Sequence, residues 1–156
     1  MTHAAKCIIE QFQNLGNLQL LAMKEILDDE SVALLADATR NGYLKKLQKL
    51  ELQVNSNITE SGWRTFFERS DHMPELGNLN ITRMYTQQIK SHATTVTSFV
   101  RFVSRLPRLV TIQMFGWLLD KDDLNMFNTM KKSHPQGKRL NLVWQWVLPF
   151  SPIIEN

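Results

Sequence analysis

Four histidines and one cysteine are the side chains of this sequence best suited to metal binding or nucleophilic catalysis. None of the histidines follows another at the His-x-x-x-His spacing that places two zinc ligands on one helix face; they are His3, His72, His92 and His134. Cys7 could pair with a histidine as a nucleophile, but it cannot form an internal disulfide or a cysteine-based zinc site. It stands beside two isoleucines in a stretch with a helical pattern, so we expect a buried thiol.

Two groups of carboxylates could suggest a cation site. They are Asp28, Asp29 and Glu30, and then Asp120, Asp122 and Asp123. Each group comes just before a stretch with helical periodicity, where acidic side chains complement the helix dipole, and we interpret both as helix starts. The glycines form no phosphate loop, because only Gly137 precedes a lysine and no glycine stands five residues before it. We expect no enzyme, no cofactor and no metal site in this chain.

The composition is that of a globular protein. The chain has 156 residues, 43% of them hydrophobic, and a formal charge of +3 with a pI near 9.1. The basic residues that gather, which we interpret as solvated faces, are Lys45, Lys46, Lys49, Arg101, Arg105 and Arg108. The single cysteine indicates a reducing compartment, and no signal peptide or long apolar stretch is present. We expect a cytoplasmic protein that binds neither nucleic acid nor a membrane.

A Leu-x-x-Leu-x-Leu pattern, with conservative changes, recurs along the chain. Its copies are Leu15, Leu18, Leu20; Leu47, Leu50, Leu52; Leu76, Leu79, Ile81; Leu109, Ile112, Met114; and the weaker Gly137, Leu140, Leu142. The copies begin 32, 29, 33 and 28 residues apart. The last two apolar positions of each copy are two residues apart, which predicts a short strand with one buried face.

Helical patterns separate these strands. Apolar residues at helical spacing are Val32, Leu35, Ala36; Trp63, Phe66, Phe67; Val96, Phe99, Val100, Val103; and Leu124, Phe127. The start signals are Asp28 or Asp29, Thr59, Thr94 and Asp120, and residues 2–12 form a further predicted helix. The repeating unit is therefore a strand followed by a helix.

The predicted fold is an α/β leucine-rich-repeat solenoid of ribonuclease-inhibitor type, with parallel strands on the concave face and helices on the convex face. A doubly wound sheet is the alternative, but it does not require the same leucine spacing in every unit. Residues 1–136 form the repeats, with an incomplete leading repeat at 1–14 and others starting near 15, 47, 76 and 109. Residues 137–156 form a longer terminal strand, with Leu140, Leu142, Trp144 and Trp146 on one face, and a C-terminal cap.

The candidate protein-binding residues flank the strand leucines on the expected concave face. They are Gln19, Lys49, Glu51, Gln53, Asn78, Asn80, Thr82, Thr111, Gln113, Phe115, Arg139 and Asn141. Most carry a neutral amide or hydroxyl, which offers hydrogen bonds to a protein partner. Such a face lacks the positive field that phosphate binding requires.

Six strings resemble one family across nearly the whole chain. They are Ile58-Thr-Glu-Ser-Gly-Trp-Arg-Thr-Phe-Phe, His92-Ala-Thr-Thr-Val, Leu106-Pro-Arg-Leu, Trp117-Leu-Leu-Asp-Lys-Asp-Asp, His134-Pro-Gln and Leu148-Pro-Phe-Ser-Pro-Ile-Ile. The sequence resembles the C-terminal leucine-rich repeats of the NAIP family, the NLR-family apoptosis inhibitory proteins, also called baculoviral IAP repeat-containing protein 1.

The resemblance implies an innate immune receptor of the cytosol. The family combines zinc-binding BIR domains, an ATP-binding NACHT module and C-terminal repeats, and it has an anti-apoptotic association. It senses bacterial flagellin or type III secretion components and recruits a CARD-containing NLR partner into an inflammasome that activates caspase-1. Only the repeats match here, so ATP and zinc are expected only in the NACHT and BIR parts.

Two functions follow as hypotheses. In the first, the chain is the terminal repeat segment of a NAIP-like receptor and acts through protein contacts and autoinhibition. In the second, it is a free-standing leucine-rich-repeat binding module or inhibitor without receptor function.

Overall fold

Each of the four later helices begins where a polar residue precedes a stripe of apolar side chains. The computed structural model describes residues 2–145. Its helices are α1 (Thr2–Glu10), α2 (Asp29–Arg40), α3 (Glu60–Arg69), α4 (Ala93–Ser104) and α5 (Lys121–Lys131). Asp28, Thr59 and Asp120 cap α2, α3 and α5 by accepting a backbone N–H three residues on, which confirms these three predicted starts. The predicted start at Thr94 is wrong, because the residue before α4 is His92.

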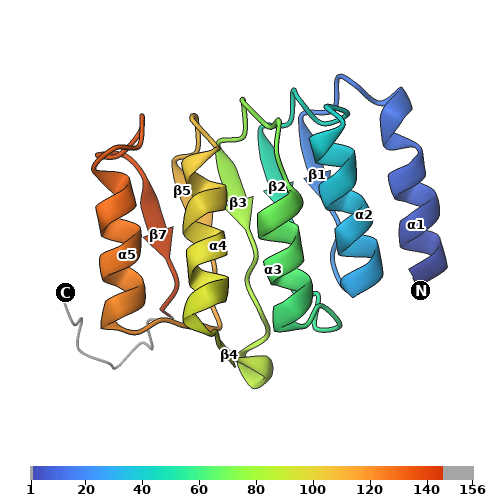
Figure 1. Ribbon diagram of the computed structural model, residues 1–156. Coiled ribbons are helices and arrows are strands. Elements are labelled where there is room, and N and C mark those ends of the chain that lie inside the picture. The colour runs from blue at the N-terminus through green and yellow to red at the C-terminus, as the bar shows by residue number, and fades with distance from the viewer. Residues whose placement is uncertain (1, 146–156) are drawn as a thin grey trace.

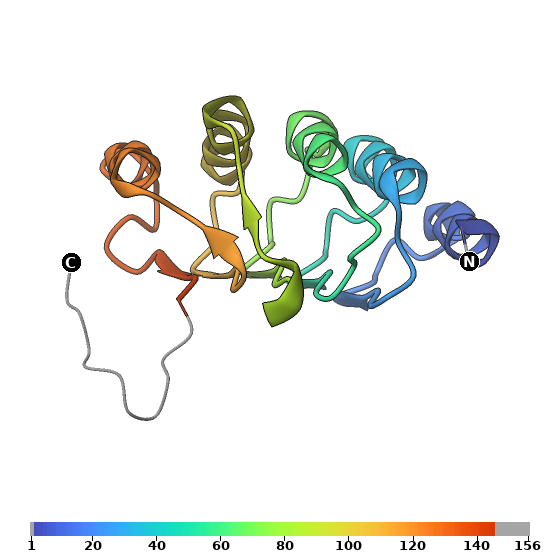
Figure 2. The ribbon, with the colours of Figure 1, turned by 90° about the horizontal axis from the view of Figure 1, so that it is seen from below.

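The strands are short, and within each sheet they pair in parallel. A five-stranded parallel sheet has the order β1 (Leu20–Ala22), β2 (Lys49–Glu51), β3 (Asn78–Asn80), β5 (Thr111–Gln113) and β7 (Asn141–Val143). A second pair joins β4 (Ile89–Lys90) to β6 (Trp117–Leu118), and 3-10 turns occupy η1 (Phe12–Asn14) and η2 (Tyr85–Gln87). The helices lie side by side along one face of the sheet (Figures 1 and 2).

The expected leucine-rich-repeat solenoid of ribonuclease-inhibitor type is wrong. Residues 2–145 form a compact α/β domain in which five helices pack on one side of a sheet of three-residue strands. The doubly wound alternative is wrong too, because no α-helix of residues 2–145 covers the other side of the sheet (Figure 2). The leucine spacing indicates that each unit contributes a strand and a helix. It does not determine how those units close on one another.

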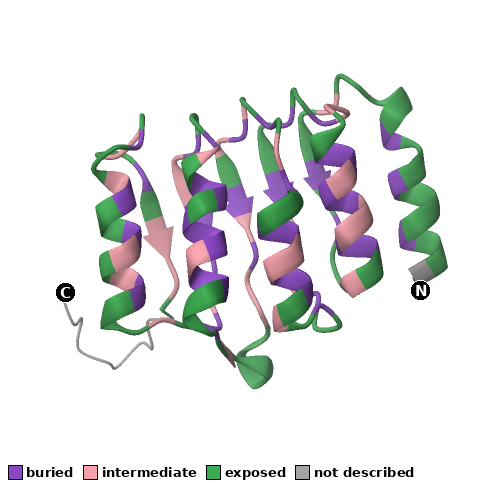
Figure 3. Ribbon diagram, viewed as in Figure 1, coloured by how far each residue is buried: buried purple, intermediate pink, exposed green. Residues whose placement is uncertain are grey.

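An aromatic cluster makes the middle of the domain different from its ends. Phe66 and Phe67 of α3 contact Phe102 of α4 with ring centroids 5.5 and 5.7 Å apart, and Trp63 meets Trp117 at 5.7 Å. All five rings are buried; Trp117 lies on β6, and the other four belong to the buried stripes of α3 and α4 (Figure 3). The core is therefore centred on α3 and α4 and is not a row of equal leucine layers.

Strand pairing corrects the register of the first and last units. In the sheet, Leu21 pairs with Leu50, and Ile112 pairs with Leu142. The sequence pattern had instead aligned Leu18 with Leu50, and Leu140 with Ile112. From Leu20 the paired positions run to Lys49, Asn78, Thr111 and Asn141, which makes the units 29, 29, 33 and 30 residues long. The corrected repeat is more regular than the predicted one. The unit of 33 residues holds the four additional residues around η2.

The predicted long terminal strand is also wrong. The last strand, β7, has three residues, like β1, β2, β3 and β5. Trp146 and the predicted cap lie outside the described residues. None of the helices within 2–145 is long and apolar enough to cross a bilayer.

Side chains of different types make the same polar link between neighbouring units. The amide of buried Asn55 accepts hydrogen bonds from the N–H groups of Ile26 and Leu27 and donates to the carbonyls of Met23 and Leu52, at 2.8–3.1 Å. Two units further along, the indole Nε1 of Trp117 donates to a carbonyl one unit back, at 2.8 Å. These bonds satisfy backbone groups that the three-residue strands leave unpaired.

The register can be tested with two adjacent leucines of β1. Leu21 is 8% exposed and Leu20 is 50% exposed, so only Leu21 contributes to the core. We expect Leu21→Ala to lower the free energy of unfolding by about 2–5 kcal/mol, because it leaves a cavity. We expect Leu20→Ala to change it by less than about 0.5 kcal/mol. Urea unfolding of both variants measures this, and an equal or larger loss for Leu20→Ala would contradict the register.

Candidate functional site

The candidate site is the sheet face, defined as the side of β1, β2, β3, β5 and β7 that points away from the helices. Strand pairing aligns its outward side chains in rows. The first row is Leu20, Lys49, Asn78, Thr111 and Asn141, and the second is Ala22, Glu51, Asn80, Gln113 and Val143. A third row, Gln53, Thr82 and Phe115, follows because the ladder continues through bonds of 2.8 Å from Val54 N to Thr82 O and from Arg83 N to Phe115 O.

The structure brings together all but two of the predicted binding residues. Gln19 precedes β1, where its carbonyl accepts from the N–H groups of Gln48 and Lys49. Arg139 precedes β7 and lines a loop cavity instead of the sheet face. Both errors follow from the wrong register of the end units.

Sequence reasoning missed Leu20 and Ala22 in the first unit. Requiring equal unit lengths, instead of the first matching leucine, would have placed both on the sheet face.

A small cavity lies in the middle of the sheet face. It has a volume of about 170 Å³ and is lined by Lys49, Glu51, Asn78, Asn80, Thr111 and Gln113, with two strand leucines at its floor. Asn80 Nδ2 donates to Gln113 Oε1 at 2.9 Å, and Asn80 Oδ1 accepts from the N–H of Thr82 at 3.0 Å. Amide groups of neighbouring strands are thus held in fixed orientations, which suits recognition by hydrogen bonds.

Two polar atoms next to this cavity lack partners. Gln53 Oε1 and Thr82 Oγ1 are both inaccessible to solvent, and neither forms a hydrogen bond with any residue of 2–145. The two residues are neighbours in the third row of the sheet face. A buried polar atom without a partner is unfavourable, so these two atoms lower the stability of this part of the fold.

The first acidic group belongs to a network that joins helix starts. Besides the cap by Asp28, Asp29 accepts from the N–H of Thr59 at 2.8 Å and from its hydroxyl at 2.6 Å. A Cβ on Gly62 would collide with the Asp29 carboxylate, so any larger residue there would displace this carboxylate. The carboxylate therefore links α2 to the start of α3, which supports its interpretation as a helix-start residue.

Glu60 repeats this link one unit further on. Its Oε1 accepts from the N–H of His92 at 2.7 Å and from the hydroxyl of Thr95 at 2.8 Å. Partial burial raises the pKa of Glu60, but these hydrogen bonds, together with the charges of His92 and Arg64, outweigh it and hold the pKa below its ordinary value of 4.5.

Two carboxylates of the second acidic group, Asp120 and Asp123, form ion pairs with a lysine. Lys90 Nζ lies 2.9 Å from Asp120 Oδ2 and 3.0 Å from Asp123 Oδ2. These hydrogen bonds raise the pKa of Lys90. The pKa of Asp120 is lowered, first by the hydrogen bond that it accepts from the N–H of Asp123 and next by the hydrogen bond from Lys90. Among residues 2–145 no three His, Cys, Asp or Glu side chains converge as metal ligands.

The expectation of a buried Cys7 is wrong, because its side chain is exposed on α1. Its Sγ lies 3.7 Å from Nε2 of His3, one helical turn away. No acceptor that would orient His3 is found among the described contacts, so the pair lacks the third member of a catalytic arrangement.

His134 is the buried histidine of the chain. Its Nδ1 accepts from the N–H of Gln136 at 3.0 Å, so the proton on Nε2 is donated to the carbonyl of Leu106, also at 3.0 Å. The ring anchors the loop between α5 and β7 to the preceding unit.

No family model matches the chain. The chain is 47% identical over 152 residues to human baculoviral IAP repeat-containing protein 1, and 45% identical over 150 residues to the mouse protein 1f of that name. These matches cover 97% and 96% of this chain but 11% of each relative, so the chain spans about a ninth of their length. Cattle NLR family CARD domain-containing protein 4 is 26% identical over 120 residues, which is 76% of the chain.

Two solved structures share the fold. The tropomodulin C-terminal domain from Caenorhabditis elegans has a TM-score of 0.64 at 15% identity, covering 94% of this chain and 84% of that one. The leiomodin-1 actin-binding site 2 has a TM-score of 0.62 at 10% identity, covering 90% and 78%. This chain matches most of the length of each of these two domains. A chain of about this length can therefore form the whole fold, which supports a compact domain over a solenoid.

The pKa of Glu60 predicts a pH-dependent contribution to stability. Because the folded pKa lies below the unfolded one, ionised Glu60 stabilises the fold above about pH 4.5, and this stabilisation is lost as the pH falls through the folded pKa. We expect Glu60→Gln to unfold at lower urea than the unmodified chain at pH 7, and the difference to shrink at pH 3. Glu30→Gln, at the exposed start of α2, is the control. A difference that is the same at both pH values would contradict this role.

Proposed function

Because this chain is homologous to the baculoviral IAP repeat-containing protein 1 family across the stretch that it shares with those proteins, we propose that the sheet face is a protein-binding surface of a NAIP-like innate immune receptor. The surface acts through contact and not through catalysis. In the resting receptor it packs against another part of the same protein and holds it inactive.

The observation that carries this proposal is the open, neutral polar sheet face. Its rows place Asn78, Asn80, Thr111 and Gln113 around one cavity, and no α-helix of residues 2–145 covers them (Figure 2). Neutral amides and hydroxyls at a concavity suit a polypeptide, whose backbone offers both donors and acceptors.

The finer parts of the proposal come from the family resemblance. The receptor responds in the cytoplasm to bacterial flagellin or type III secretion components, and a CARD-containing NLR partner then joins it in an inflammasome that activates caspase-1. The segment contributes contacts to the resting and the ligand-bound forms.

The test uses human baculoviral IAP repeat-containing protein 1 in which this chain replaces the matching segment. We expect Asn80→Arg with Gln113→Arg to raise ligand-independent assembly about tenfold, since two buried interface charges would break the resting contact. Native gel electrophoresis of the purified receptor, with and without flagellin, measures assembly.

A matched control adds the same charges on the helix side. Asn125→Arg with Asn128→Arg changes exposed positions of α5, and we expect no change in assembly. Deleting the whole segment provides a second test. If basal assembly and ligand response both remained unchanged after deletion, the proposed role would be wrong.

A further inference from the structure

The positive charge of this chain is concentrated near its C-terminal end. Residues 124–145 contain Lys131, Lys132, Lys138 and Arg139 and no aspartate or glutamate. The stretch 91–119 contains three arginines and likewise no acid. The formal charge of +3 therefore understates the local field in this part of the molecule.

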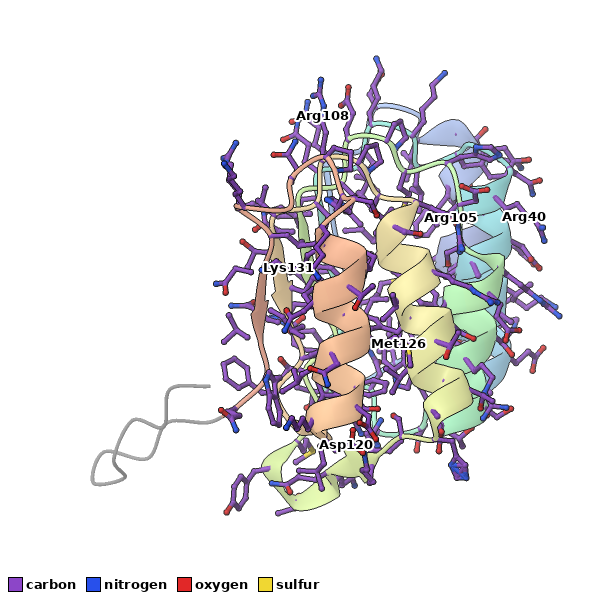
Figure 4. All side chains as sticks on the ribbon, turned by 60° about the vertical axis from the view of Figure 1, so that its left-hand side comes forward. Arg40, Arg105, Arg108, Asp120, Met126 and Lys131 are labelled. Atoms are coloured by element: carbon purple, nitrogen blue, oxygen red, sulfur yellow. The ribbon has the colours of Figure 1, made fainter. Side chains whose placement is uncertain are left out.

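The helices place this charge at one edge of the domain. Figure 4 shows Arg40, Arg105, Arg108 and Lys131 toward one end of the helices, and Asp120 at the opposite end. Arg105 is used within the fold, because its Nη2 donates to the carbonyls of Phe67 and Ser70 at 2.7 and 3.0 Å. The cations at the end of α5 and in the loop that follows it have no such partners within residues 2–145.

A cavity of about 730 Å³ lies in that loop. Lys131, Lys132, Gln136, Lys138 and Arg139 contribute to its lining. No carboxylate within residues 2–145 lies within 4.0 Å of any of its four cations, and none of their side chains forms a hydrogen bond to this part of the chain. The helix dipole accounts for cations at the end of α5, but Lys138 and Arg139 stand beyond that helix.

The loop that carries these cations is held in place. His134 ties it to Leu106 and to the N–H of Gln136 through both ring nitrogens. Gly137 packs so closely on the backbone that a Cβ there would collide with the carbonyl oxygen of Lys131. These contacts return the chain over the end of α5, so Lys138 and Arg139 face the same cavity as Lys131 and Lys132. The site is preorganised, which reduces the entropic cost of binding an anion.

We propose that this loop cavity binds a compact anion with several phosphate groups, either a free inositol polyphosphate or the head group of a phosphoinositide lipid. The guanidinium of Arg139 matches two phosphate oxygens at once, while the lysines act as point charges and Gln136 supplies an amide donor. A volume of about 730 Å³ falls within the range of small-molecule sites. An acidic peptide is less suitable, because an extended chain spreads its charges by about 3.3 Å per residue beyond one loop.

This site is independent of the proposed receptor function. Its cavity and that of the sheet face share no lining residue. The two proposals can therefore fail separately.

The test is calorimetric titration of the full 156-residue chain with inositol hexakisphosphate at low and physiological salt. We expect saturable binding that weakens as salt rises. Lys138→Gln with Arg139→Gln should weaken it at least about tenfold. As a control, Lys45→Gln with Lys46→Gln removes the same amount of charge from a loop outside the cavity. This variant should change the binding affinity by less than about twofold. Circular dichroism checks that each variant is folded.

Vesicles containing phosphatidylinositol 4,5-bisphosphate separate the two sources of phosphate. Vesicle binding that inositol hexakisphosphate displaces indicates a lipid head group, and binding of the free compound alone indicates a soluble ligand. The proposal is overturned by absence of binding at about 1 mM ligand, where affinity would be negligible. Equal weakening by the Lys45 and Lys46 control also overturns it, as does a hexaglutamate peptide that binds as tightly.

Discussion

The pairing of one apolar residue per unit determines the register of the whole five-stranded sheet. Leu21, Leu50, Leu79, Ile112 and Leu142 occupy paired positions across the five-stranded sheet. A three-residue strand cannot bury its own leucine, so each unit depends on its neighbours for its core. Because strand side chains alternate, this inward column also determines the rows that point outward. The candidate protein-binding face is thus a direct consequence of core register.

The links between units are conserved in role but not in residue type. The carboxylates of Asp29 and Glu60 each accept the N–H at the start of the next helix. At the following step α4 begins with Ala93, which has no carboxylate, and Lys90 bridges to Asp120 instead. Asn55 and Trp117 likewise differ in type but play the same role, because each donates a side-chain N–H to a backbone carbonyl of the preceding unit. Different side chains thus form hydrogen bonds at equivalent places in different units.

Local patterns predicted most helices and strands. The register of the first unit and the compact shape depend on tertiary packing, which the local patterns do not contain. The spacing of Trp63, Phe66 and Phe67 predicted α3, and the side chain of Thr59 predicted its cap. The first unit contained two overlapping leucine patterns, beginning at Leu15 and at Leu18, and only pairing with β2 distinguishes them. The compact shape depends on aromatic contacts between α3 and α4, which involve residues far apart in sequence. Binding by the sheet face stays a prediction.

The common direction of the helices explains why the two proposed surfaces differ in chemistry. Their positive ends gather at one edge, where the carboxylates of Asp28, Asp29 and Asp120 are used by caps and links. Their negative ends gather at the opposite edge and favour cations there. Lys138 and Arg139 lie past the last helix and have no carboxylate partner within residues 2–145, so their field reaches solvent. The sheet face between the edges is mostly neutral, so we expect it to recognise a partner by hydrogen bonds. We therefore expect one molecule to hold a protein and an anion at the same time, with salt weakening the anion contact more than the protein contact.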